Sequence, residues 1–363
     1  MADHLPQIPP LAINARFLEG SMTAVNRVAL ELSKALVCHA RAQGVPNAIQ
    51  LIGYPALEAV MIETGLPYIT IGKRTGILWE QLELPHALQG RTLVGFHNTA
   101  PVMGGNHITM LHDAQVFDQP ESYPLPTRLW RQFLSRRAGA AGRKILTVSE
   151  FSKSRLIAWK IAPEDRIDVI YNGVGHLKSC KPEPKILTQL VLEKRSYFVG
   201  LASLQPHKNI KILLEAFHAP ELKDMRLVLT GAGTKEDFEA AGYPVPSNVI
   251  FSGFVSDGAL RSLYESAIAV CTPSLTEGFG LPPLEGMTLG TPAVVAPCGA
   301  LPEVCQDGAL YAAPDKPEEW VENLTRLASD EVLRAELSTK GRAISKGFSW
   351  STAAKTILKI LDK

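Results

Sequence analysis

Short apolar runs alternate with amphipathic stretches through the first half of the chain. Runs dense in Val, Ile and Leu predict buried strands, whereas apolar residues spaced three and four apart predict helices. The predicted strands are residues 11–13, 49–52, 93–96, 108–111 and 145–148. The predicted helices are residues 25–36, 127–140 and 149–159, the last with Ser149 as its N-cap. Strands that alternate with helices are typical of a parallel sheet covered on both faces.

The pattern is interrupted over residues 176–195, which are mixed and contain prolines, and it then starts again. The further predicted strands are residues 197–201, 226–230, 249–252, 268–271 and 292–296. The further predicted helices are residues 210–217, 258–267, 281–289 and 317–328. A length of 363 residues suits two domains of ordinary size. We therefore predict two α/β domains, residues 1–180 and 195–345, which bind ligands at the carboxyl ends of their strands in a cleft between them.

Composition excludes several classes of protein. The 37 Lys and Arg against 36 Asp and Glu leave a formal net charge of +1, so the chain lacks the bulk positive field of a nucleic-acid-binding protein. The five cysteines are odd in number and form no Cys-x-x-Cys pair, which predicts reduced thiols and no zinc site. No secretory signal and no bilayer-spanning apolar run is apparent. We expect a soluble, cytoplasmic protein.

The segment from Thr272 to Glu285 carries the clearest chemical signal. A buried strand ends just before it at Cys271, a loop with Gly278 and Gly280 follows, and two prolines open a helix. Proline suits the first turn because its missing N–H would have no intrahelical partner. The loop amides and the positive end of the helix dipole together form the kind of site that binds phosphate. The two glycines let the backbone approach such a ligand closely.

Glu277 and Glu285 flank this anion site. A carboxylate there would repel phosphate, so its expected task is to accept hydrogen bonds from hydroxyl groups. Two such acceptors on either side of a phosphate suit a sugar and a ribose, and together they describe a nucleotide-sugar pocket. The alternative is that Glu277 is a solvated loop residue and that Glu285 lies on the helix surface.

The chain resembles the retaining glycosyltransferases of family 4, which have the α/β GT-B fold of two Rossmann-like domains facing each other across a cleft. The resemblance rests on short motifs that occur in the family's order along nearly the whole chain. They are Leu111-His112-Asp113, Val148 to Lys153, Tyr171 to Val174, Gln205 to Asn209, Pro273 to Pro282, Gly299 to Val304 and the Glu-x7-Glu pair of Glu277 and Glu285. Residues 346–363 resemble the family's closing helix, which crosses back to the first domain.

By this resemblance the first domain binds the acceptor and the second binds the donor. Glu277 is implied to bind hydroxyls of the donor sugar, and Glu285 the ribose. Lys208 is implied to bind the diphosphate and to offset charge on the leaving group, the electrostatic contribution that usually dominates catalysis. His112 is implied to lie near the sugar and the reacting centre. The other implied donor contacts are the backbone of Val255 for the base, and Gly278, Phe279, Gly280 and Leu281 for the sugar and diphosphate.

Two positions depart from the family's pattern. Ser203 stands where many members have an arginine, so Lys208 is expected to be the main cation that this loop offers to the diphosphate. Ala24 stands where relatives have a glycine, and alanine adopts a positive φ less readily, which argues against close approach of this loop to the diphosphate. The candidates for phosphate or acceptor contacts in the first domain are Arg16, Thr23, Asn26 and Arg27.

The implied reaction is transfer of a hexose from a nucleotide-sugar donor to a hydroxyl of a glycan or lipid-pyrophosphate-linked acceptor in surface polysaccharide synthesis. Overall likeness favours mannose from GDP-mannose slightly over glucose from UDP-glucose. We expect no cofactor and no metal, because no Asp-x-Asp motif ends a strand and the phosphates already have amides, a helix dipole and Lys208. The alternatives are a non-catalytic, two-lobed nucleotide-sugar binding protein and a GT-B epimerase or phosphorylase.

Residues 126–137 form a basic stretch with aromatic and leucine side chains at helical spacing. In one interpretation this helix lies on an anionic membrane surface or binds a lipid pyrophosphate, which makes the protein peripheral on the inner face of the membrane. In the other interpretation its aromatic side chains pack inward and its arginines are solvated.

Overall fold

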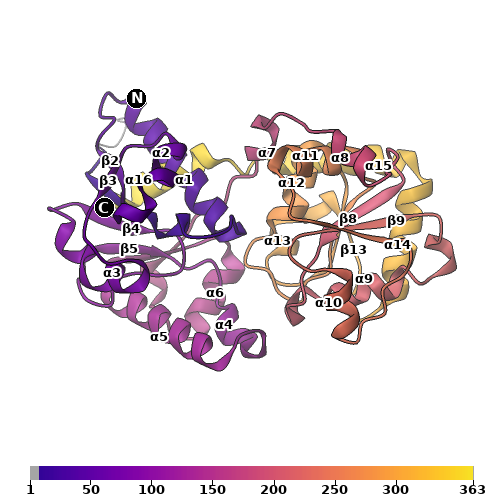
Figure 1. The fold of residues 1–363 in the computed structure, drawn as a ribbon, viewed down its shortest axis with the longest axis horizontal. Coiled ribbons are helices and arrows are strands. Elements are labelled where there is room, and N and C mark those ends of the chain that lie inside the picture. The colour runs from indigo at the N-terminus through magenta and orange to yellow at the C-terminus, as the bar shows by residue number, and fades with distance from the viewer. Residues whose placement is uncertain (1–7, 363) are drawn as a thin grey trace. The chain divides into compact units, whose positions relative to one another are not determined.

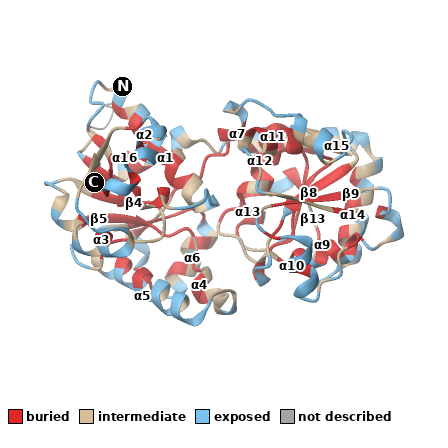
Figure 2. Cartoon of the chain, in the orientation of Figure 1, coloured by how far each residue is buried: buried red, intermediate tan, exposed pale blue. Residues whose placement is uncertain are grey.

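Two parallel β-sheets organise the chain in the computed structural model, which describes residues 8–362 (Figure 1). Each sheet belongs to its own unit. The first unit contains the described residues up to Gly173 and those from Ser349 onward, and the second contains Val174–Phe348. Figure 2 shows that the central strands are buried in both units while exposed residues lie on the outer faces of the helices. The predicted α/β class is confirmed.

The sheet of the first unit has seven strands in the order β3-β2-β1-β4-β5-β6-β7. Every pair is parallel, and Leu11 lies opposite Ile49 on one side and Thr92 on the other. The strands are β1 Leu11–Asn14, β2 Ile49–Gly53, β3 Tyr68–Thr70, β4 Thr92–Gly95, β5 His107–Met110, β6 Lys144–Thr147 and β7 Ile167–Val169. The helices are α1 Ala24–Ala42, α2 Glu58–Thr64, α3 Gly76–Leu82, α4 Gln115–Asp118, α5 Leu125–Ala141, α6 Glu150–Ala158 and α16 Trp350–Leu361.

Capping and packing fix two of these helices. Ser149 is the N-cap of α6, as predicted, and its hydroxyl accepts a hydrogen bond from the amide of Ser152. The terminal helix α16 packs against α1 within the first unit, where Ser351 lies in hydrogen-bond contact with His39 (Figure 1). Among the described residues, no helix is both long enough and apolar enough to cross a bilayer.

The sheet of the second unit has six parallel strands in the order β10-β9-β8-β11-β12-β13. The strands are β8 Tyr197–Leu201, β9 Arg226–Thr230, β10 Val249–Gly253, β11 Val270–Thr272, β12 Ala293–Val295 and β13 Ala309–Tyr311. The helices are α7 His176–Ser179, α8 Lys185–Gln189, α9 Ile210–Ala216, α10 Lys235–Ala240, α11 Asp257–Ser266, α12 Leu281–Leu289, α13 Leu301–Cys305, α14 Pro317–Ser329 and α15 Glu331–Ser345.

Alternate strand residues of the second unit pack into two hydrophobic layers. Phe198 of β8 joins a cluster with residues of α9 and α14 on one face of the sheet. Tyr197 and Val199 point to the other face and join a cluster with residues of α7, α11 and α12. Helices therefore cover both faces, as the continuous apolar character of the strands requires.

The segment predicted as a linker, residues 176–195, belongs to the second unit. It contains α7 and α8, and Leu177 and Leu192 are buried in the same cluster as Tyr197. Its apolar residues therefore extend the helical layer on that face of the sheet. The predicted boundary is corrected accordingly: the chain leaves the first unit after Gly173 and re-enters it at Ser349.

Candidate active site

Two loops at the carboxyl edge of the second sheet carry the predicted donor residues. The loop after β8 contains a single 3-10 turn, Pro206–Lys208, and ends at Asn209, whose φ of 52° is left-handed. The loop after the adjacent strand β11 runs from Pro273 to Gly280. The carboxyl ends of neighbouring parallel strands meet at one edge of a sheet, which is where α/β proteins bind ligands.

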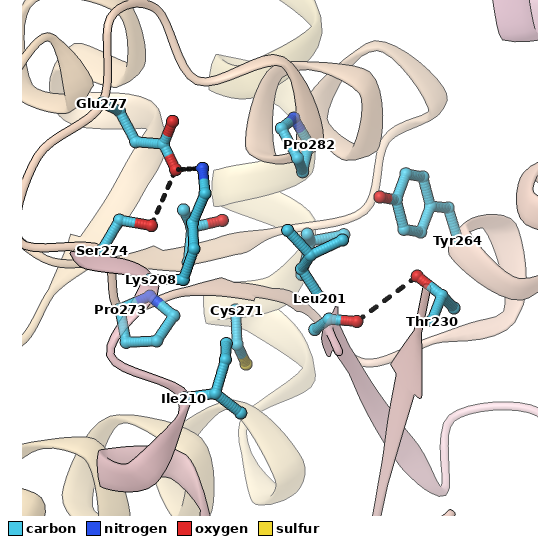
Figure 3. A pocket seen from close by; sticks show the side chains of 13 residues that line it. Leu201, Lys208, Ile210, Thr230, Tyr264, Cys271, Pro273, Ser274, Glu277 and Pro282 are labelled. Carbon is cyan, nitrogen blue, oxygen red and sulfur yellow. Dashed lines mark hydrogen bonds and ion pairs between the residues drawn. The ribbon is translucent and has the colours of Figure 1, made fainter. Parts of the chain in front are cut away.

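Lys208 and Glu277 face each other across these loops (Figure 3). The Nζ atom of Lys208 donates a hydrogen bond to Oε1 of Glu277 at 2.7 Å, and Oγ of Ser274 donates to the same oxygen, also at 2.7 Å. Both charged side chains are largely buried, with exposed fractions of 19% for Lys208 and 13% for Glu277. The alternative that Glu277 is a solvated loop residue is therefore wrong, and Lys208 is not a surface lysine.

The ion pair keeps Glu277 ionised. Burial raises the pKa of its carboxyl, but the Lys208 ammonium, the hydrogen bonds from Lys208 and Ser274, and the nearby His207 together outweigh burial and lower the pKa below its ordinary value. The site thus presents a fixed carboxylate, which can accept hydrogen bonds from hydroxyl groups, beside an ammonium that can bind phosphate.

A small cavity lies beside the pair, lined by residues at the ends of β8, β9 and β11. Its volume of about 30 Å³ accommodates one or two water molecules. Lys208 and Glu277 are among its lining residues, and a sugar is too large to fit inside it.

The start of α12 has the predicted form. Gly280 is its N-cap with a φ of 102°, Leu281 is the first helical residue, and the two prolines occupy the rest of the first turn. A side chain at Gly280 would meet the Leu301 side chain at 2.7 Å, so both conformation and space require glycine there. Phe279 is buried and packs edge-on against Phe348 at 5.6 Å between ring centroids.

Gly299 packs closely against the backbone of Glu277. Its φ is +62°, and a Cβ there would clash with the backbone nitrogen and oxygen of Glu277. The amide of Ala300 donates a hydrogen bond to that oxygen at 2.9 Å. Gly299 belongs to one of the motifs that the sequence singles out, but its contact with Glu277 was not predicted.

We expect Gly299→Ala to weaken donor binding about tenfold, because the new methyl group would displace the backbone of Glu277. The substitution also carries the conformational cost of a positive φ in alanine, which is about 1 kcal/mol. Gly242→Ala is the matched control, since Gly242 has a φ of +84° and open space around it. Nucleotide titration of both variants checks this expectation. Equal affinities in the two variants would show that the close contact at Gly299 is unimportant.

Glu285 lies inside the second unit rather than on the surface of α12. It is 7% exposed, and its Oε1 atom is 3.3 Å from Nε2 of His176. The surface-residue alternative for Glu285 is therefore wrong, while its proposed contact with a ribose stays a prediction. His176 was missed because it falls in the segment that we predicted as a linker.

The other two predicted donor residues lie on the same edge of the second sheet. Ser203 follows β8, is half-buried, and accepts a hydrogen bond from the amide of Gln205 at 3.3 Å. Val255 follows β10 and packs against the cluster that contains Tyr197 and Val199. Their roles in donor binding stay predictions.

His112 follows β5 at the carboxyl edge of the first sheet and is 6% exposed. Its Nε2 atom is 2.7 Å from the carbonyl oxygen of Phe96, which can only accept, so Nε2 carries the proton and Nδ1 is left as an acceptor. Burial lowers the pKa of His112 and outweighs the Phe96 hydrogen bond and the nearby Asp113, which raise it. The ring is therefore neutral, a state in which Nδ1 can accept a hydrogen bond from a sugar hydroxyl.

Arg16 is bound by carboxylates of the first unit. Its Nη1 atom donates to Oε2 of Glu80 at 2.6 Å, and its Nε atom is 3.3 Å from Oε1 of Glu19. Glu80 is fully buried and also accepts hydrogen bonds from Asn14 and Thr99. Two carboxylates therefore offset the charge of Arg16 within the first unit, and its contact with phosphate or acceptor stays a prediction. Glu80 lies in α3, a short helix that the apolar pattern does not reveal.

Thr23, Asn26 and Arg27 lie at the start of α1. Thr23 is its N-cap, and its hydroxyl accepts a hydrogen bond from the amide of Asn26 at 3.2 Å. Arg27 lies 3.9 Å from Glu31. Ala24 is the first helical residue and does not have a positive φ. The expectation that this loop does not approach the diphosphate closely stays a prediction.

Two family models match the chain. The model described as Glycosyltransferase Family 4 matches residues 64–176, and the model described as Glycosyl transferases group 1 matches residues 183–344, which include Lys208, Glu277 and Glu285. The chain belongs to the family of glycosyltransferases that these two models describe.

Two of the curated relatives are O-antigen chain mannosyltransferases. O-antigen chain mannosyltransferase B of Escherichia coli is 31% identical over 259 residues, 67% of this chain and 66% of the relative. The O-antigen chain mannosyltransferase RfbU of Salmonella typhimurium is 29% identical over 240 residues, 64% of each chain. The chain thus spans about two thirds of the length of these relatives.

The chain also resembles solved structures over almost its whole length. HepE of Anabaena, in complex with UDP and glucose, matches 97% of this chain and 98% of its own with a TM-score of 0.73 and 18% identity. This likeness, together with the two parallel sheets, confirms the predicted GT-B class of fold.

Proposed function

We propose that the chain is a mannosyltransferase that moves mannose from GDP-mannose to a hydroxyl of a glycan or lipid-linked acceptor in surface polysaccharide synthesis. The observation that carries this proposal is the buried Lys208–Glu277 pair at the carboxyl edge of the second sheet. It sets a cation for the diphosphate beside a carboxylate for sugar hydroxyls, in a chain of a glycosyltransferase family.

The choice of mannose follows two of the curated relatives, which are named O-antigen chain mannosyltransferases. UDP-glucose is the second candidate donor because HepE, which shares the fold, is bound to UDP and glucose. A titration of the purified protein with GDP-mannose and with UDP-glucose distinguishes the two, and we expect tighter binding of GDP-mannose.

In the reaction we propose, Lys208 offsets the charge that develops on the departing diphosphate, and Glu277 holds hydroxyls of the sugar as its bond to the phosphate breaks. Neutral His112 offers its Nδ1 atom to a hydroxyl of the sugar. We propose retention of the anomeric configuration and no requirement for a metal, since Lys208 and the loop amides already serve the phosphates. NMR of the product and assays with and without EDTA test these two points.

Release of GDP in the presence of an acceptor separates transfer from the alternatives. A protein that binds GDP-mannose but releases no nucleotide with any acceptor would be a non-catalytic binding protein. An epimerase would alter the sugar without an acceptor, and a phosphorylase would require inorganic phosphate. Failure to bind either nucleotide-sugar would overturn the proposal.

We further propose that α5 brings the first unit to an anionic membrane surface. The helix contains no acidic residue, and four of its apolar side chains are exposed. They are Leu125 and Leu129, each 55% exposed, Phe133 at 45% and Trp130 at 38%. The interpretation with aromatic side chains packed inward is therefore wrong. Arginines beside an exposed apolar stripe suit an interfacial helix.

We expect Leu129→Glu to lower binding to vesicles of phosphatidylcholine and phosphatidylglycerol about tenfold or more. The substitution removes a leucine side chain whose burial in the bilayer contributes about 1.5–3 kcal/mol, and it adds a negative charge that the anionic lipid repels. Val332→Glu is the control, since Val332 is 80% exposed but lies on α15 of the second unit. Co-sedimentation at low and high salt measures the effect. Equal binding of both variants would contradict this use of α5.

A further inference from the structure

Lys208 lies between two residues that are both hydrogen-bonded to the Glu277 loop. On one side, the carbonyl oxygen of His207 accepts a hydrogen bond from the amide of Leu275 at 2.8 Å. On the other side, Nδ2 of Asn209 donates to the carbonyl oxygen of Pro273 at 3.2 Å. The Lys208 side chain then closes a third contact between the same two segments through Glu277.

Asn209 also reaches a third loop. Its Nδ2 atom donates to the carbonyl oxygen of Pro314, which follows β13, at 2.7 Å. The side chain is 3% exposed, and both of its amide protons have acceptors. One amide group thus ties together loops that follow β8, β11 and β13 of the same sheet.

The backbone at Asn209 explains why this residue type suits the position. Its φ of 52° is left-handed, a conformation that asparagine and glycine adopt at little cost. The turn directs the chain from the Lys208 loop into α9, which begins at Ile210. Glycine would adopt the turn equally well but would supply neither of the two hydrogen bonds to Pro273 and Pro314, which we call the brace. The substitution Asn209→Gly therefore removes the brace and keeps the turn.

We propose that Asn209 is a positioning residue that holds Lys208 and Glu277 at the separation needed to grip the diphosphate and the sugar of one donor. It acts through the backbone of both loops and touches no substrate. The inference deepens the proposed function and rests on it. Ser274, whose hydroxyl bonds Glu277, directly follows the Pro273 carbonyl that Asn209 binds, so the brace reaches both charged groups.

The matched control is Asn248, an asparagine with the same kind of brace at the other edge of the sheet. Its Nδ2 atom donates to the carbonyl oxygens of Leu222 and Met225 at 3.0 and 3.1 Å, immediately before β10. Asn209→Gly and Asn248→Gly each remove two hydrogen bonds from a side-chain amide to backbone carbonyls. Each also raises the conformational entropy of the unfolded chain by the same amount. Both are expected to lower the melting temperature by a few degrees, while only Asn209→Gly is expected to weaken GDP binding, by about tenfold.

A double-mutant cycle shows whether Asn209 acts through Lys208. GDP affinity is measured for the wild type, Asn209→Gly, Lys208→Ala and the double variant. We expect the tenfold loss from Asn209→Gly to shrink below about twofold when Lys208 is already absent. An equal loss in both backgrounds, or no loss in the wild-type background, would overturn the inference.

Hydrogen exchange tests the brace without any nucleotide. Asn209→Gly is expected to speed exchange of the Leu275 amide, which is bonded to His207, about tenfold, while Asn248→Gly leaves it unchanged. An unchanged Leu275 amide in Asn209→Gly would overturn the inference even if the wild type binds GDP. A wild type that binds neither GDP nor UDP would instead overturn the proposed function, whatever the exchange rates.

Discussion

Glu277→Ala is expected to lower kcat/KM about 100-fold or more while leaving the fold intact. A hydrogen bond to a charged group contributes about 1.5–3 kcal/mol, and the Glu277 carboxylate is held by Lys208 and Ser274 so that it can accept such bonds from sugar hydroxyls. Release of GDP from GDP-mannose in the presence of an acceptor measures the loss. Near-normal turnover would remove Glu277 from the active site.

Two further variants separate charge from shape at Glu277. Glu277→Gln keeps an oxygen that can accept from Ser274 and Lys208 but loses the charge, so we expect its turnover to fall between those of the wild type and of Glu277→Ala. Glu239→Ala is the control, because Glu239 forms an ion pair with Lys235 at 3.6 Å in which both side chains are about half exposed. Exposed pairs of this kind contribute little, and this variant should behave as the wild type does.

The central strands of both sheets could be predicted from the sequence, and so could the edge strand β10, but the other three edge strands could not. β8 and β9 match the predicted ranges at both ends, because strands buried on both faces are continuous apolar runs. The missed strands β3, β7 and β13 are edge strands of three residues with half-buried positions. A run of three residues is too short to stand out as a strand, whereas β10, also an edge strand, has five residues and was predicted.

Helix α12 was also predicted at both ends, for a local reason. Gly280 and Gly290 flank it, and both have the positive φ that glycine adopts readily at a helix boundary. The short helices α7 and α8 gave no such signal. Their apolar residues are too few for a periodic pattern, and their packing against β8 is decided by tertiary contacts.

The residue types of the site could be predicted, but their pairing could not. Lys208 and Glu277 were each assigned to the donor, yet the bond between them joins residues 69 positions apart in the sequence. It depends on β8 and β11 being neighbours in the sheet, an order that the apolar pattern does not contain. Asn209 and Gly299 were missed as contacts of these loops for the same reason.

Lys208→Ala is expected to weaken binding of GDP and GDP-mannose about 10- to 100-fold and to lower turnover with it. The reason is that a charge-assisted contact to the diphosphate, about 1.5–3 kcal/mol, is lost. Lys235→Ala, which removes a lysine from an exposed ion pair of the same unit, is the control. Unchanged affinity in Lys208→Ala would place the diphosphate elsewhere on the protein.

The same substitution is expected to change the pH dependence in a defined direction. In the wild type, burial raises the pKa of Glu277, while Lys208 and the neighbouring donors bring it below its ordinary value, so the carboxylate stays ionised into acidic solution. Without Lys208, the charge and the hydrogen bond that lower the pKa most are lost, so we expect the pKa of Glu277 to rise. In the proposed role the ionised carboxylate accepts hydrogen bonds from hydroxyls of the sugar, so we expect activity to be lost as pH falls through this pKa. A profile of kcat/KM against pH should therefore show its acid limb at higher pH in Lys208→Ala than in the wild type or Lys235→Ala, and an acid limb that does not move would mean that Lys208 does not control the charge of Glu277.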